Sequence, residues 1–178
     1  MMESATKEAA VNVFWGIQMC PVPDGCDARR VGPCIKRYLR ELGYSGPITI
    51  TAVDVLSDVP PKTLEAVFTT GISLYNGPLG LKDMSGCIRD CCDIHESPIN
   101  IMAISSFPET ISILRRGIAH FGFKLILANA ETLSEILLVS EEDMCSETSE
   151  SALWTCAVCK KFDGRDKQFH HASLFSRT

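Results

Sequence analysis

Short apolar runs rich in β-branched residues alternate with segments of helical periodicity along most of this chain. Five runs predict strands, at residues 11–17, 48–53, 71–75, 99–105 and 123–128. A helical pattern follows each run, at residues 27–42, 60–67, 81–94, from Pro108 onwards and 131–138. Strands that each lead into a helix form a mostly parallel sheet covered on both faces. We therefore predict a three-layer α/β/α fold with five strands, in which the almost wholly apolar first, fourth and fifth runs favour central positions.

Composition limits the classes of function. The chain has 178 residues, with 46% apolar and 22% charged residues, as expected for one globular domain. No apolar run is long enough to cross a membrane, and the polar start does not resemble a secretory signal. We expect a cytoplasmic protein, with the nucleus as the alternative, and reduced cysteines. The net charge of −5 argues against nucleic-acid binding by the whole surface but allows a local basic patch.

The carboxyl-terminal part differs from the domain that precedes it. We predict a domain at residues 8–139, an acidic linker at 140–152 and a small tail at 153–178. In the tail, Cys156 and Cys159 have the spacing of zinc ligands, and His170 follows after ten residues. Structural zinc takes four ligands, so this set resembles a zinc finger cut short. The alternative is a disordered tail with free thiols.

The predicted topology also limits where a ligand can bind. In a parallel sheet, ligands bind beyond the carboxyl ends of the strands, where the strand order reverses. This rule points to residues 16–23, 76–83 and 105–109. No glycine-rich phosphate loop follows the first run, and no G-x-S-x-G motif is present, which argues against dinucleotide, P-loop and serine-hydrolase sites.

Residues 13–23, VFWGIQMCPVP, resemble the opening motif of NYN domains, a branch of the PIN-like ribonucleases that typically reads V-F-W-D-I-E-N-C-x-V-P. The stretches DGCDARRVG and LGYSGPITITAV resemble plant members with a zinc-finger tail. The architecture is similar to that of the meiosis regulator and mRNA stability factor proteins. The resemblance covers about residues 11–138 and the tail. It implies strand order 3-2-1-4-5 and acids, at the ends of the first and fourth strands, that bind Mg²⁺ or Mn²⁺ for RNA cleavage.

The sequence departs from the family pattern at these positions. Gly16 stands at the first acid position, and Gln18 lies at the neighbouring Glu position. After the fourth strand, the family's S-G-D-x-D pattern aligns with Ser105 to Glu109, so that Phe107 replaces the first acid and Glu109 retains the second. The expected centre of the site is therefore short of carboxylates.

Three acids remain as candidate metal ligands: Asp83, Asp90 and Glu109. Asp83 matches the acid that opens the third helix, whereas Asp90 lies one residue out of register with a further acid position. Three carboxylates suffice for one Mg²⁺ or Mn²⁺ ion but suit a two-metal site poorly. The alternative is that they are ordinary helix-start or helix-face residues, which the helix dipole favours at Asp83 and Glu109.

Basic residues predict a local RNA interface. Arg29, Lys36 and Arg40 fall within about 40° on a helical wheel, and Arg115, Arg116 and Lys124 form a second cluster. Phosphate groups are contacted by such side chains. The alternative is an ordinary solvated helix face.

The resemblance and the missing acids lead to one hypothesis and two alternatives. We expect an NYN-type protein in RNA metabolism and the regulation of gene expression, impaired as a ribonuclease and acting by RNA binding. An active Mg²⁺- or Mn²⁺-dependent endoribonuclease that uses the remaining acids is the first alternative. A protein-interaction module that makes no RNA contact is the second.

Overall fold

A parallel sheet forms the centre of the computed structural model, which describes residues 6–95, 98–106, 115, 118, 122–138 and 152–156. Within these residues six strands lie in the order β5-β4-β1-β2-β3-β6. The strands are β1 (Val11–Trp15), β2 (Ile48–Asp54), β3 (Ser73–Asn76), β4 (Asn100–Ile104), β5 (Lys124–Ala128) and β6 (Trp154–Cys156). Every neighbouring pair is parallel. The predicted order 3-2-1-4-5 is confirmed for the first five strands.

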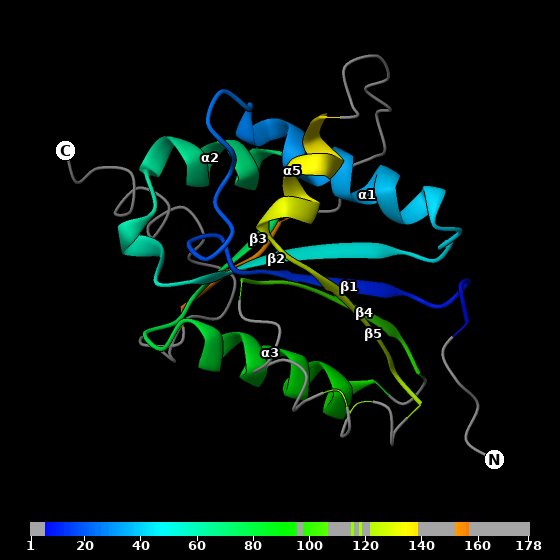
Figure 1. Cartoon of the computed structure of the whole chain (residues 1–178). Helices are drawn as coiled ribbons and strands as arrows, with labels where there is room; N and C mark the ends of the chain where they lie inside the picture. The colour runs from blue at the N-terminus through cyan, green and yellow to red at the C-terminus, as the bar shows by residue number, and fades with distance from the viewer. Residues whose placement is uncertain are drawn as a thin grey trace.

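Helices cover both faces of the sheet and give the predicted three layers. Helices α1 (Val31–Glu41), α2 (Pro61–Thr69) and α5 (Ala130–Leu138) lie on one face, and α3 (Leu81–Ile94) lies on the other (Figure 1). The predicted helix that begins at Pro108 lies outside the described residues except for Arg115 and Ile118, which are both helical. No helix in the described ranges is long and apolar enough to cross a membrane.

Two apolar clusters hold the layers together, one on each face. Successive residues of β1 belong to different clusters, because successive side chains of a strand point to opposite faces of the sheet. Trp15 joins the cluster under α1, α2 and α5, whereas Phe14 joins the cluster under α3. The residues of β4 are all buried, as its central position requires.

The prediction of a central position for the fifth run is wrong, because β5 is the last strand of the described sheet on its side. Its side chains explain the apolar sequence. Ile126 packs against the cluster under α1, while Leu125 and Leu127 pack against the cluster under α3. An edge strand covered on both faces is as apolar as a central one.

The tail contributes to the sheet, which the sequence did not predict. Trp154–Cys156 pairs with β3 in parallel, and Leu74 N donates to Leu153 O at 2.8 Å. The sheet therefore has a sixth strand from the segment that resembles the start of a zinc finger. Cys159, His170 and most of the acidic linker lie outside the described residues.

Candidate functional site

The carboxyl ends of β1 and β4 lie side by side, as the predicted site requires. Gly16 N donates to Ile104 O at 3.0 Å directly after the two strands. The loop that follows β1 is tied to the segment after β4, because Ser106 Oγ donates to Met19 O at 2.6 Å. Phe107 and Glu109, the next predicted site residues, lie outside the described part of the chain.

Methionine side chains fill the space in front of Gly16. A Cβ atom added at Gly16 would overlap the terminal methyl of Met19 and lie 3.2 Å from that of Met84, which is fully buried. Ser105 Oγ lies 3.6 Å from the Met19 sulfur. A side chain at the first acid position would therefore meet two thioethers. Mg²⁺ and Mn²⁺ prefer oxygen ligands, so this environment does not suit either ion.

Asp83 stabilises the start of α3. Its Oδ2 atom accepts a hydrogen bond from Leu79 N at 2.6 Å, in the loop that leads into the helix. The carboxylate lies so close to Gly77 that a Cβ atom there would overlap it. Such a bond satisfies a backbone donor at a helix start, and the helix dipole adds to it. This observation favours a structural role for Asp83.

Asp90 does not come together with Asp83. Seven residues separate them on α3, which corresponds to about 10 Å along the helix axis. One ion therefore cannot bind both carboxylates directly. No group of three His, Cys, Asp or Glu side chains suits a metal ion within the described ranges.

Cys87 lies between the two acids on α3. Burial raises the pKa of its thiol to about 12, and the negative charges of Asp90 and Asp83 add to the effect. Since the thiolate is the reactive form of cysteine, Cys87 is unsuited to act as a nucleophile at neutral pH.

We expect native protein at pH 8 to react slowly with iodoacetamide at Cys87. Unfolding removes the burial and the nearby charges, so the same thiol should then react at the rate of an ordinary cysteine. Mass spectrometry of the Cys87 peptide after timed alkylation, with and without urea, measures both rates. Equal rates in the two states would contradict the raised pKa.

Asp54 is the site residue that the sequence analysis missed. It is only 3% exposed, at the end of β2. Its Oδ2 atom accepts from Gln18 N at 2.9 Å, and its Oδ1 atom accepts from Val55 N at 3.1 Å. Its backbone oxygen accepts from Gly77 N at 3.0 Å. Asp54 thus joins the segments that follow β1, β2 and β3, and an acid that ends a β-branched run was the available signal.

A groove of about 520 Å³ lies between the loop after β1 and the 3₁₀ turn after β2. Asp24 and Asp58 bring negative charge to it, and neither forms an ion pair with a described residue. Its other lining residues are mostly apolar: Ile17, Gln18, Pro21, Val22, Val59, Pro60 and Thr63. The groove therefore suits a cationic ligand better than a phosphate group.

The basic residues predicted on the first helix do not form one free surface. The Nη1 atom of Arg29 lies 3.9 Å from Oδ2 of Asp27, the residue that caps the turn before α1. Arg40, at the far end of α1, donates to Tyr44 O at 2.9 Å and to Gly46 O at 2.7 Å. Lys36 lines a separate hollow beside β2 and Leu153. The three residues therefore have three different environments.

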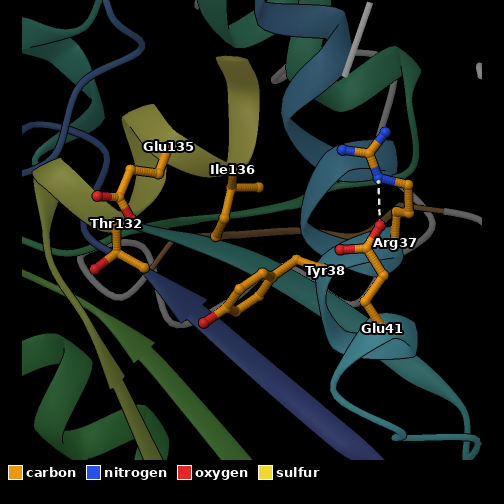
Figure 2. A pocket seen from close by; sticks show the side chains of 6 residues that line it. All are labelled: Arg37, Tyr38, Glu41, Thr132, Glu135 and Ile136. Atoms are coloured by element: carbon orange, nitrogen blue, oxygen red, sulfur yellow. Dashed lines mark ion pairs between the residues drawn. The ribbon is translucent and has the colours of Figure 1, made fainter. Parts of the chain in front are cut away.

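The neighbouring Arg37 is also engaged. Its Nε atom lies 3.3 Å from Glu41 Oε1 in a pocket of about 220 Å³ between α1 and α5. Figure 2 shows the residues that line this pocket, which are Arg37, Tyr38 and Glu41 from α1 and Thr132, Glu135 and Ile136 from α5. Because the pocket holds two carboxylates and one guanidinium, it is no better suited to phosphate than the groove. Arg116 lies outside the described residues, and the side chain of Arg115 is exposed.

Comparison with known proteins gives no family assignment: no family model matches the chain, and no curated protein matches it.

Proposed function

We propose that this protein is an NYN-type domain of the PIN-like class that takes part in RNA metabolism and the regulation of gene expression without cutting RNA. The opening motif at residues 13–23 and the strand order 3-2-1-4-5 support this proposal. The observation that carries it is the filling of the space at Gly16 by the side chains of Met19 and Met84.

The loss of cleavage follows from the chemistry that the missing groups would supply. In metal-dependent cleavage of a phosphodiester, Mg²⁺ or Mn²⁺ activates water and stabilises the charge that develops on the phosphate. These ions need carboxylate oxygens that converge on one point. Here Gly16 offers no side chain, and Asp83 holds the start of α3. The described residues of the site therefore do not fit the ion.

We expect no metal-dependent cleavage when the pure protein is incubated with end-labelled RNA in Mg²⁺ or Mn²⁺. Gel analysis should give the same pattern with EDTA and for the Asp83→Asn variant. Cleavage that requires Mn²⁺ and disappears in Asp83→Asn would instead establish the active endoribonuclease. The same samples test RNA binding, which should weaken as salt rises because phosphate contacts release counterions.

One observation favours a second candidate function, a protein-interaction module without RNA contact. The groove lined by Asp24 and Asp58 is negatively charged and has walls that include Pro21 and Pro60. Rigid walls lose little entropy on binding, and carboxylates attract Lys or Arg side chains of a partner. This candidate predicts that RNA affinity is absent at every salt concentration.

A further inference from the structure

Positive charge gathers at the amino ends of the strands, opposite the expected site. Lys7 Nζ lies 4.9 Å from the centroid of the Tyr44 ring, and Lys124 Nζ lies 5.4 Å from the same centroid. Lys7 also donates to Leu42 O. Arg40 reaches the same turn, where it donates to the backbone oxygens of Tyr44 and Gly46. We call Lys7, Arg40 and Lys124 the amino-end patch.

No acid in the described part of the chain forms an ion pair with either lysine of the amino-end patch. Arg29 pairs with Asp27 and Arg37 pairs with Glu41, and neither pair involves Lys7 or Lys124. Glu8, next to Lys7 in sequence, interacts with the side chain of Thr6. Two ammonium groups held against one ring repel each other, and a bound anion relieves this repulsion.

The geometry of Tyr44 limits what the amino-end patch can recognise. The ring is only 4% exposed, and the lysines lie against it, so it is not open to stacking by a base. Recognition would therefore rest on charge alone. Contacts of this kind attach to phosphates and carry no direct sequence information.

The opposite end of the sheet has the contrary charge. Asp24 and Asp58 line the groove beyond β1 and β2, and Asp83 lies at the start of α3. A phosphate backbone placed there would meet carboxylates. The charge distribution therefore directs a polyanion to the amino ends of the strands.

We propose that the amino-end patch binds the phosphate backbone of single-stranded RNA with little sequence preference. This inference rests on the proposed function, since it assumes that the protein binds RNA. The proposed interface lies where β5, α1 and the segment before β1 meet, and not on the α1 surface of Arg29 and Lys36 that the sequence predicted.

The test is fluorescence anisotropy with a fluorescein-labelled single-stranded RNA of mixed sequence, over a range of salt concentrations. For Lys7→Ala/Lys124→Ala we expect affinity to fall on the order of tenfold at low salt. The slope of log affinity against log salt should become shallower by about 1.4, since each phosphate contact on a single strand contributes about 0.7. The double variant Lys7→Arg/Lys124→Arg keeps both charges and should bind like wild type.

The matched control is Lys62→Ala/Lys82→Ala, which removes two exposed lysines outside the amino-end patch. It changes net charge equally and should leave the salt slope unchanged. Circular dichroism should give similar thermal midpoints for all variants. If Lys7→Ala/Lys124→Ala binds like wild type while wild type binds RNA, the patch is wrong and the proposed function stands. If wild type shows no salt-sensitive RNA binding, the proposed function itself fails.

Discussion

Gly16→Asp should destabilise the protein by about 3 kcal/mol, because it places a carboxylate against the thioethers of the half-buried Met19 and the fully buried Met84. The new Cβ atom would overlap the Met19 methyl group and lie 3.5 Å from Ile104 O. Urea unfolding followed by tryptophan fluorescence measures the loss as a lower midpoint at constant slope.

Gly16→Ala is the matched control for this substitution. It adds the same Cβ atom without charge, and the flexible end of Met19 can move aside, so we expect a loss of about 1 kcal/mol. An ion that binds only the folded state raises the stability of a protein. Since we expect no Mn²⁺ to bind at this position, Mn²⁺ should not restore the stability of Gly16→Asp. A Gly16→Asp variant as stable as wild type, or one rescued by Mn²⁺, would contradict the filled site and reopen the nuclease hypothesis.

The fold could be predicted from sequence where the local pattern is strong. The β-branched run that ends at Asp54 and the cap at Asp27 both define elements through short-range chemistry. The predicted helix end at residue 42 is followed by Gly43, whose φ of 87° is a conformation that favours glycine. Strand β6 escaped prediction because three residues give no periodicity. Its pairing with β3 depends on the presence of an unpaired edge in the folded sheet, which the local sequence does not encode.

The site could be predicted only in part. The motif register identified Gly16 as the missing acid, but not the reason that no acid fits there. Met19 and Met84 meet in front of it although 65 residues separate them. From the sequence, Asp83 could be either a metal ligand or a residue that stabilises the start of a helix. The hydrogen bond that its carboxylate accepts from Leu79 N favours the second role. Likewise, Lys7 and Lys124 come together only in the fold.

Asp54→Ala is expected to lower the free energy of unfolding by about 3 kcal/mol, because it leaves two backbone donors without their acceptor. Gln18 N and Val55 N both donate to the Asp54 carboxylate. Asp54 is almost fully buried, so water cannot readily take the place of the carboxylate. Urea unfolding measures this loss of stability. The substitution should also increase the rate of hydrogen exchange more at the Gln18 amide than at the amides of β4.

Asp54→Asn separates hydrogen bonding from the loss of the side chain. Its one oxygen can accept from either donor, while its NH₂ group faces the other, so we expect roughly half the loss of Asp54→Ala. Asp58→Ala is the surface control. Asp58 is exposed, and the one hydrogen bond described for its side chain is accepted from Ser57 Oγ at 3.4 Å, so the loss should stay within about 0.5 kcal/mol. If Asp54→Ala were as mild as Asp58→Ala, the segments after β1 and β2 would be held by the backbone and by apolar packing, and not by this carboxylate.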